Sequence, residues 1–280
     1  MNPQLLDGKA ASEQIRNDLR ARVEKLKLRG GPVPVLVTIL VGNNPSSEVY
    51  VKMKGKACES IGLGSRKIQM PEETTTQELL KVIDECNADP TVRGILLQHP
   101  SPPQIDERAA FDRIAIDKDV DGVTAFGFGR MSLGIQAYPA CTPAGIVKLL
   151  DHYKINLSGL HAVIVGRSPI LGKPMAQLLL NRDCTITVCH SRTKDLPRHV
   201  QSADLVVAAC GKPRYIVGDW IKEGAIVVDA GYNDGNIGDA DFESCAKKAS
   251  WITPVPGGVG PMTITTLIAH TVESAEKAVG

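Results

Sequence analysis

The sequence has no long hydrophobic run and no marked surplus of charge of either sign. No stretch of about eighteen apolar residues occurs, and the amino terminus lacks a charged segment followed by a hydrophobic one. We therefore expect neither a membrane span nor a secretory signal. Lysines and arginines number 32 against 31 aspartates and glutamates, a balance that argues against nucleic acid or an anionic membrane as a partner.

Cysteine pairs of the C-x-x-C type are also missing. The seven cysteines are scattered, so we predict neither a structural zinc site nor a redox dithiol, and no metal site of another kind. Without an export signal, we expect reduced thiols in a cytoplasmic protein. A chain of 280 residues is long enough for one large or two medium domains, each with its own core.

Residues 161–176, with the sequence HAVIVGRSPILGKPMA, predict a strand, a glycine loop and the start of a helix. Pro174 suits the first helical turn, where its missing N–H is not needed. Gly166 and Gly172 would let the loop approach a phosphate at the helix N-terminus. Their G-x5-G spacing departs from the G-x-G-x-x-G fingerprint, so a parallel α/β domain with ordinary glycine turns is the alternative.

No acidic residue directly follows the next expected strand, residues 184–189. An NAD-binding fold usually places a carboxylate about 20 positions beyond the glycines, where it holds the ribose 2′-hydroxyl. Here the strand is followed by His190-Ser191-Arg192-Thr193. Together with Arg167, these side chains favour the 2′-phosphate of NADP, because a carboxylate would repel a phosphate and arginine binds it bidentately.

The rest of the chain alternates expected helices and strands. Helices are expected at 8–29, from Ser46 or Ser47 to about 61, at 76–87, 106–114, 143–153 and 263–277. Residues 30–32 would end the first, and Thr142 would cap the fifth, with Pro143 at its first position. Strands are expected at 33–41, 65–70, 94–97, 203–210 and 225–230, the last two followed by Gly211 and Gly231. This alternation predicts parallel sheets, in which ligands bind beyond the carboxyl ends of the strands. Gln98 directly follows strand 94–97 and is thus placed where chemistry would occur.

Ser47, Tyr50 and Lys54 are spaced to share one face of a helix. Tyr50 offers a flat apolar ring with a hydroxyl, and a partly buried Lys54 would have a lowered pKa and could exchange protons near neutrality. The alternative is a solvated face on which Lys52, Lys54 and Lys56 all contact water.

Three further places have both a functional and a structural interpretation. Asp119 and Asp121 could bind the N–H donors of a ligand or cap backbone groups. Cys141 could be a nucleophile at a helix start or a small packed thiol. In residues 253–263, three glycines between prolines could admit a ligand close to the backbone, or the segment could be a plain loop before a helix.

Seven motifs in order along almost the whole chain resemble the bifunctional 5,10-methylenetetrahydrofolate dehydrogenase/methenyltetrahydrofolate cyclohydrolase family. They are Tyr50-Val51-x-x-Lys54-x-Lys56 with Gly62, Gly94-Ile95-Leu96-Leu97-Gln98, Lys118-Asp119-Val120-Asp121-Gly122, Cys141-Thr142-Pro143, Gly166-Arg167-Ser168, His190-Ser191-Arg192-Thr193 and the run from Pro254 to Thr263. The resemblance implies an α/β fold of two domains joined by long helices with a cleft between them. Residues 1–143 and 264–280 would form the folate-binding catalytic domain, and residues 144–263 a Rossmann-like NADP-binding domain with a parallel sheet.

The resemblance also implies two reactions. NADP would oxidise 5,10-methylenetetrahydrofolate to the methenyl compound, which water would open to 10-formyltetrahydrofolate. Lys54 would be the general acid/base, with Gln98 positioning it and helping to set its protonation state, and Ser47 supporting it. Tyr50 would stack on the aminobenzoyl ring of the folate, and Asp121 would accept hydrogen bonds from the pterin.

Further residues are assigned by the same resemblance. Gly260 and Pro261 would also contact the substrate. The cofactor would be held by Gly166, Arg167, Ser168, Gly172, Ser191, Arg192, Gly211 and Tyr232. The partners implied are tetrahydrofolate derivatives and a second copy of the chain, in a cytoplasmic homodimer of one-carbon metabolism.

The chain departs from the family pattern at a few positions, none of them a proposed catalytic residue. His99 and Ser101 stand where leucines are common, Ala140 replaces a proline, Tyr232 an isoleucine and Ala240 a valine, and Ala269-His270 replaces a common asparagine before Thr271. With Gly280 as the last residue, we expect no synthetase domain. The alternatives are an NADP-dependent dehydrogenase for another small substrate and a non-enzymatic NADP-binding regulator. Neither has a use for Tyr50, Lys54, Gln98 and Asp121 together.

Overall fold

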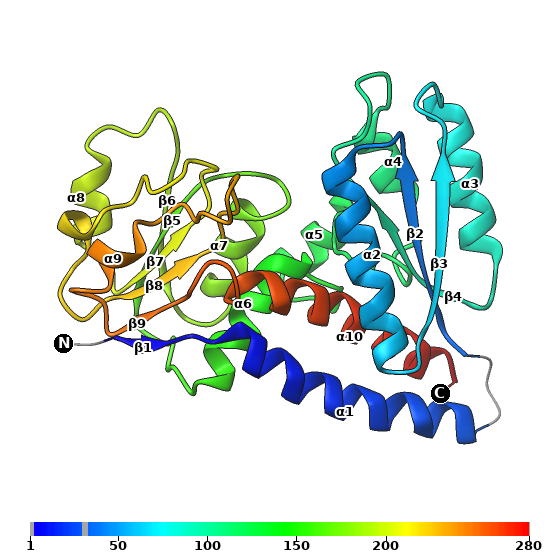
Figure 1. Cartoon of the computed structure of the whole chain (residues 1–280), viewed down its shortest axis with the longest axis horizontal. Coiled ribbons are helices and arrows are strands. Elements are labelled where there is room, and N and C mark those ends of the chain that lie inside the picture. The colour runs from blue at the N-terminus through cyan, green and yellow to red at the C-terminus, as the bar shows by residue number, and fades with distance from the viewer. Residues whose placement is uncertain (1–2, 30–32, 280) are drawn as a thin grey trace. The chain divides into compact units, whose positions relative to one another are not determined.

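The computed structural model describes residues 3–29 and 33–279, except the side chain of Ser46. The chain separates into two compact units, residues 14–141 with 264–280 and residues 1–13 with 142–263 (Figure 1). Helices α1 (Gly8–Leu28), α6 (Cys141–His152) and α10 (Val259–Val279) each run across a unit boundary. The predicted α/β class with parallel sheets is confirmed. The expected end of the first helix at residues 30–32 lies outside the described residues, and the expected cleft stays a prediction.

The unit of residues 14–141 and 264–280 is built on a three-stranded parallel sheet. Strand β2 (Val35–Val41) lies between β3 (Gly64–Met70) and β4 (Val92–Leu97). Helices α2 (Pro45–Ser60) and α3 (Thr76–Ala88) make the crossovers between these strands, and α4 (Glu107–Arg113) and the unexpected α5 (Ala125–Ser132) follow. Because the strands are parallel, their carboxyl ends share one edge, where Gln98 follows β4.

Helix α2 begins earlier than the sequence predicts. Its N-cap is Asn44, whose side-chain oxygen accepts a hydrogen bond from the Ser47 N–H at 3.1 Å, and Pro45 occupies the first helical position. The expected cap at Ser46 or Ser47 is therefore wrong. Asparagine followed by proline satisfies the first turn because proline has no N–H to be paired there.

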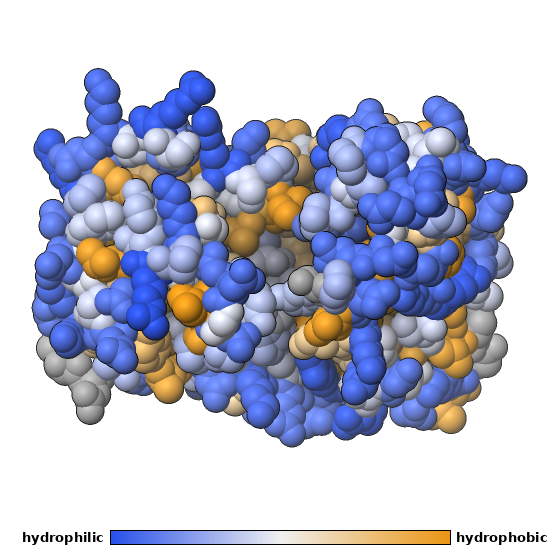
Figure 2. Space-filling model, turned by 45° about the horizontal axis from the view of Figure 1, so that its top comes forward, coloured by the Kyte–Doolittle hydropathy of each residue, from blue (hydrophilic) through white to orange (hydrophobic). Residues whose placement is uncertain are grey.

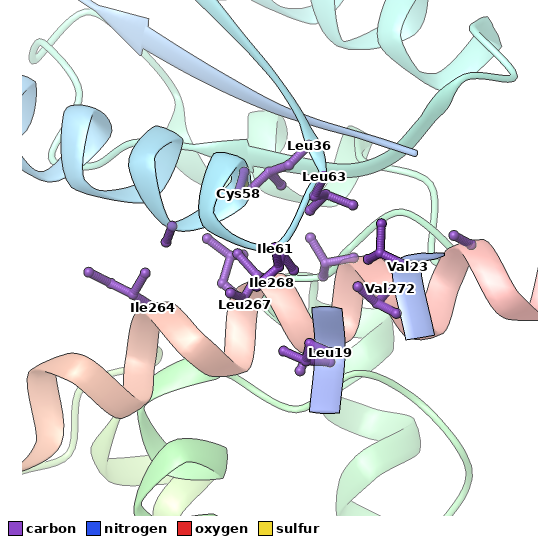
Figure 3. Close-up of a cluster of buried hydrophobic side chains, with 14 of the residues drawn as sticks. Leu19, Val23, Leu36, Cys58, Ile61, Leu63, Ile264, Leu267, Ile268 and Val272 are labelled. Atoms are coloured by element: carbon purple, nitrogen blue, oxygen red, sulfur yellow. The ribbon is translucent and has the colours of Figure 1, made fainter. Parts of the chain in front are cut away.

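The core of this unit lies where α1, α2 and α10 meet. Leu19 and Val23 of α1 belong to one buried cluster with Ile268 and Val272 of α10, and Ile61 at the end of α2 points into it (Figure 3). Steps of four residues keep the apolar side chains on one helix face. The predicted amphipathic helix at the start of the chain is thus confirmed, and it fixes α2, the helix that carries Lys54.

The unit of residues 1–13 and 142–263 contains a six-stranded, all-parallel sheet. The strand order is β1 (Gln4–Leu5), β9 (Trp251–Ile252), β8 (Ile226–Asp229), β7 (Leu205–Ala208), β5 (His161–Val165) and β6 (Thr185–Cys189). Helices α7 (Gly172–Leu180), α8 (Leu196–Gln201) and α9 (Phe242–Cys245) and the short 3-10 helix η1 (Gly218–Trp220) connect the strands. The chain leaves β5 toward β6 and returns to β7 on the other side. This order creates a switch point at the carboxyl end of β5, where dinucleotides bind in such folds.

The start of the chain joins this second sheet. Gln4 and Leu5 pair with Trp251 and Ile252, and the Leu6 N–H donates to the Ile252 carbonyl at 2.9 Å. The units therefore divide the chain differently from the predicted domains at residues 1–13 and at residues 142–143, which fall in the unit of the six-stranded sheet. A strand of two residues has no hydrophobic periodicity, so the sequence pattern gives no sign of it. Helix α10 likewise starts at Val259, four residues before the predicted 263.

Apolar side chains are collected mainly in the two cores. On the face drawn in Figure 2, hydrophilic residues predominate and hydrophobic residues form small groups among them. None of the described helices combines the length and apolar character that crossing a bilayer requires.

Two glycines with the same backbone conformation give a matched stability test. Gly122 has φ +69°, and a Cβ there would lie 2.3 Å from the Pro139 carbonyl carbon; Gly134 has φ +70° with open space around it. We expect Gly134→Ala to cost about 1 kcal/mol from the left-handed backbone alone. Gly122→Ala should cost about 3 kcal/mol or more, because a backbone clash is added. Thermal and denaturant unfolding would measure both, and equal losses would contradict the close approach at Gly122.

Candidate active site

Lys54 and Gln98 meet at the carboxyl edge of the three-stranded sheet. The Lys54 ammonium or amine donates to Gln98 Oε1 at 2.9 Å. The Gln98 amide nitrogen donates to the His99 carbonyl at 2.8 Å, and the Gln98 backbone N–H to the Ile39 carbonyl at 2.8 Å. Since a carbonyl can only accept, these bonds hold the amide oxygen toward Lys54.

The surroundings of Lys54 favour its neutral form. The side chain is half-buried on α2, and burial lowers its pKa. The Asp121 carboxylate acts in the opposite direction and raises the pKa, as does Cys141. An amine with a lowered pKa can accept and return a proton nearer neutrality than an exposed lysine. The solvated-face alternative is therefore wrong for Lys54, whereas Lys52 and Lys56 are exposed.

Asp121 stands in a loop that is held at both ends. Before it, Lys118 donates to three carbonyls at the end of α3, those of Cys86, Asn87 and Asp89, at 2.7–3.1 Å. On its other side, the Asp121 carbonyl accepts the Cys141 N–H at 3.2 Å. This clamp fixes the backbone that carries the Asp121 carboxylate.

The neighbouring Asp119 has a structural task. Its carboxylate is 1% exposed and accepts the N–H groups of Val123 and Thr124 at 3.0 Å each. Burial raises the pKa of Asp119 to about 6. For Asp119, the capping interpretation is therefore confirmed.

Cys141 and His270 both contact the backbone of the loop that carries Asp121, at the carbonyl of Val120. The Cys141 thiol donates to the Val120 carbonyl at 3.2 Å, and His270 Nδ1 lies 2.9 Å from that carbonyl. Both side chains are buried, with 3% exposure each. The packed-thiol interpretation of Cys141 is confirmed.

Ser47 and Tyr50 occupy the same stretch of α2 as Lys54. Ser47 is buried in the first turn, and Tyr50 is 36% exposed, so its ring is accessible to a ligand. Their roles toward Lys54 and the folate stay predictions.

A separate cavity of about 270 Å³ lies at the switch point of the six-stranded sheet. It is lined by residues that follow β5, β6 and β7: Gly166, Arg167 and Ser168, then His190 and Ser191, then Ala209, Cys210 and Lys212, with Tyr215. The lining includes two cationic side chains, Arg167 and Lys212, and no carboxylate among the described residues. These are the properties that a site for a phosphorylated ligand needs.

The glycine loop packs closely against the turn after β7, which requires a glycine at position 166. Gly166 has φ +138°, and a Cβ there would lie 1.9 Å from the Ala209 carbonyl oxygen. Ser168 Oγ accepts the N–H groups of Leu171 and Gly172 at 3.2 and 3.4 Å. Its own hydroxyl proton can therefore be donated to a phosphate oxygen.

The turn after β6 is stabilised by hydrogen bonds between its own side chains and its backbone. The His190 N–H donates to Thr193 Oγ1 at 2.8 Å, and the Arg192 N–H donates to His190 Nδ1 at 3.1 Å. Since Nδ1 accepts, a neutral His190 carries its proton on Nε2. Ser191 lines the cavity, and Arg192 is exposed beside it.

The predicted cofactor residues fall into two groups. Gly166, Arg167, Ser168 and Ser191 line the cavity, whereas Gly172, Arg192, Gly211 and Tyr232 are not among its lining residues. Gly172 instead packs against the loop, because a Cβ there would meet the Gly166 carbonyl oxygen at 2.2 Å. Sequence reasoning missed Tyr215 and did not count Lys212 among the cofactor residues; the Lys212 ammonium lies 4.6 Å from the centre of the Tyr215 ring. Lys212 directly follows Gly211 beyond a predicted strand, which is the signal that could have identified it.

The glycine-rich run before α10 is used in part for packing. The Gly257 carbonyl accepts the Lys9 N–H at 3.0 Å, and a Cβ on Gly8 would lie 1.7 Å from the Gly258 carbonyl oxygen. Gly260, in the first turn of α10, has open space around its Cα, and Pro261 is half-buried. Among the described residues, no group of histidine, cysteine and carboxylate side chains could hold a metal ion.

Comparison with known proteins places both units in one family. Residues 6–121 match the model for the tetrahydrofolate dehydrogenase/cyclohydrolase catalytic domain, and residues 140–279 that for the family's NAD(P)-binding domain. A relative from Shouchella clausii, named bifunctional protein FolD, is 59% identical over 99% of both chains.

Solved structures agree with this match. The chain is similar to the bifunctional FolD methylenetetrahydrofolate dehydrogenase/cyclohydrolase from Campylobacter jejuni, with a TM-score of 0.96 and 46% identity over 98% of this chain and 99% of that one. It is also similar to the Trypanosoma brucei dehydrogenase-cyclohydrolase, solved in complex with NADP and an inhibitor, with a TM-score of 0.94 and 33% identity over 99% and 98% of the two chains. The chain therefore belongs to the tetrahydrofolate dehydrogenase/cyclohydrolase family.

Proposed function

We propose that Lys54, Gln98 and Asp121 carry out the folate chemistry of this chain and that the cavity after β5 holds its cofactor. The chain is a bifunctional enzyme that oxidises 5,10-methylenetetrahydrofolate with NADP and hydrolyses the methenyl product to 10-formyltetrahydrofolate. The observation that carries the proposal is the half-buried Lys54, with its lowered pKa and its 2.9 Å bond to Gln98.

Lys54 is suited to both proton transfers of the hydrolysis. As water adds to the cationic methenyl carbon, it must lose a proton, which the neutral Lys54 amine accepts. The carbon–nitrogen bond then breaks, and the resulting ammonium returns the proton to the leaving nitrogen. A cationic substrate next to Lys54 would itself disfavour the ammonium form, so it would reinforce the effect of burial.

Gln98 orients the Lys54 amine without fixing its charge. An amide oxygen accepts a hydrogen bond from either protonation state of the lysine, whereas a carboxylate would hold it as ammonium. The bonds from Gln98 to His99 and Ile39 keep this acceptor in place.

Asp121 and Tyr50 would bind the folate. The clamped loop presents the Asp121 carboxylate, which can only accept hydrogen bonds when ionised and so suits the amino and ring N–H groups of a pterin. The exposed ring of Tyr50 suits stacking on the aminobenzoyl group. Ser47, Gly260 and Pro261 complete the proposed substrate set.

For the cofactor, NADP supplies the hydride acceptor when bound. Arg167, Ser168 and Ser191 would hold its phosphates, with Arg192 beside them and the glycine loop admitting the pyrophosphate. The described lining of the cavity has cations and hydroxyls and no carboxylate of the kind that NAD-binding folds use for the ribose, which favours the 2′-phosphate. Gly172, Gly211 and Tyr232 belong to the same proposed set, and the relative from Trypanosoma brucei is described with NADP.

A cytoplasmic homodimer completes the proposal. The family resemblance supports it, and β6 is an edge strand of the six-stranded sheet, paired only with β5 in the described part of the chain. An edge strand of this kind can pair with a second copy. The two alternatives, another NADP-dependent dehydrogenase and a non-enzymatic regulator, do not account for the family match of the catalytic unit.

The first test mixes the purified protein with 5,10-methylenetetrahydrofolate and either NADP or NAD, and records reduced cofactor and methenyl intermediate by their separate absorbances. We expect NADPH with little methenyl accumulation beyond the non-enzymatic control, and slower reduction of NAD. Stoichiometric methenyl accumulation would contradict the cyclohydrolase activity. No reduction of either nucleotide would contradict the dehydrogenase activity.

Replacement of Lys54 separates the two steps. We expect Lys54→Met to lower methenyl hydrolysis by about 10²- to 10⁴-fold, because the proton acceptor is lost, with less damage to hydride transfer. Lys56→Met, on the exposed side of the same helix, is the matched control and should leave both rates unchanged. Equal loss of both activities in a folded Lys54→Met protein would count against the assigned role.

The charge of Asp121 should be visible in the pH profile. Asp121 raises the pKa of Lys54, so Asp121→Asn lowers that pKa further. The neutral amine exists above its pKa, and hydrolysis that needs this form rises with pH through it. The rising limb of kcat for methenyl hydrolysis, measured at saturating substrate, should therefore move to lower pH in Asp121→Asn. An unmoved limb would mean that Lys54 is not the titrating group.

A further inference from the structure

The backbone of the turn that follows β7 is hydrogen-bonded to a single side-chain carboxylate, that of Asp239. Asp239 Oδ2 accepts the N–H groups of Cys210 at 2.6 Å and Gly211 at 2.8 Å. Asp239 Oδ1 accepts the Lys212 N–H at 2.9 Å and the side-chain amide of Asn233 at 3.1 Å. Three consecutive backbone donors thus depend on a side chain that is itself 0% exposed.

A second buried carboxylate holds the first. Asp229, 3% exposed at the end of β8, accepts the N–H groups of Gly231, Asp239 and Ala240 at 2.8–2.9 Å. Burial raises the pKa of Asp229 to about 6. Burial therefore destabilises the charged form of Asp229, and the hydrogen bonds from the three backbone N–H groups offset only part of this desolvation.

Two glycines make room for the pair. A Cβ on Gly231 would lie 2.2 Å from Asp239 Cγ, and a Cβ on Gly238 would lie 1.9 Å from Asp229 Oδ2. The backbones of Gly231 and Gly238 therefore pack directly against the two carboxylates. A side chain at either glycine would therefore displace one of the two carboxylates.

The held turn forms part of the cofactor cavity. Cys210 and Lys212 both line it, and the ammonium of Lys212 lies 4.6 Å from the centre of the Tyr215 ring, another lining residue. Moreover, the N–H groups of residues 210–212 are already bound to Asp239, so they are not available to a phosphate. Backbone donors to a phosphate must then come from the side of the cavity that follows β5 and β6, and the turn itself contributes the side chain of Lys212.

We propose that Asp239 is a positioning residue for NADP, which acts by holding the turn of residues 210–212 in the shape that places Lys212 in the cavity. This proposal rests on the proposed cofactor site. Asp239 does not contact the cofactor itself, and Asp229 sets the position of Asp239 in turn.

The variant Asp239→Asn tests this role with almost no change in size. An amide has one accepting oxygen and one donating nitrogen, so in either orientation its NH₂ faces an N–H of the turn. We expect the KM for NADP to rise by about tenfold or more in the dehydrogenase reaction, the scale of a lost charged hydrogen bond. The KM for methylenetetrahydrofolate and the cofactor-free hydrolysis of the methenyl compound should be unchanged.

Asp241→Asn is the matched control. It removes the same charge two positions away, from a helix start where the side chain makes no capping bond. It should leave the KM for NADP unchanged. A rise in the KM for NADP of the same size in both variants would overturn the proposal, since charge alone would explain it. Loss of both activities in Asp239→Asn would overturn it in favour of a purely structural role.

Hydrogen exchange on the wild-type protein tests the same point without a variant. If Asp239 holds the turn, the amides of residues 210–212 are protected before NADP is added. Fast exchange that slows only with NADP would overturn the proposal, because the cofactor would then form the turn. If the wild-type protein neither binds nor reduces NADP, the proposed function fails, and a comparison of the exchange rates with those of Asp239→Asn still reports whether Asp239 holds the turn.

Discussion

Backbone N–H groups in buried loops must find acceptors, and in both units of this chain buried carboxylates provide them. Asp119 accepts two N–H groups in the loop beside Asp121, and Asp239 accepts three in the turn after β7. An unpaired N–H at these depths would cost about as much as a lost hydrogen bond, so each loop is confined to one conformation. The side chains that these loops carry are therefore in place before any ligand arrives.

The chemistry proposed for Lys54 depends on a similar confinement. Its amine is half-buried and faces an amide oxygen whose orientation is fixed by the bonds of Gln98 to its own neighbours. Burial and the Asp121 carboxylate shift the pKa of Lys54 in opposite directions, and burial has the larger effect. In the proposed function, this lowered pKa lets a residue that is normally charged serve as the proton acceptor, and α2 holds it through the apolar packing around Ile61.

Much of this arrangement could be predicted from local patterns. The Val-rich run at residues 161–165, the glycine loop after it and the face of α2 with Ser47, Tyr50 and Lys54 all have short-range signals. Residues that act through long-range contacts could not be found in that way. Tyr215 comes beside Arg167 only when β5 and β7 pair, Asp239 reaches its turn across 27–29 positions, and β1 is too short for a period. The family resemblance supplied roles that spacing alone left open.

The pairing of β1 with β9 bears on how this protein can be divided. A fragment of residues 142–263, cut at the unit boundaries, would leave β9 as an unpaired edge and remove the donors of Gln4 and Leu6 that satisfy the carbonyls of Ser250 and Ile252. Exposed edges of this kind recruit strands from other molecules. A cofactor-binding fragment that stays monomeric would need the first residues of the chain joined back to it, for instance by circular permutation.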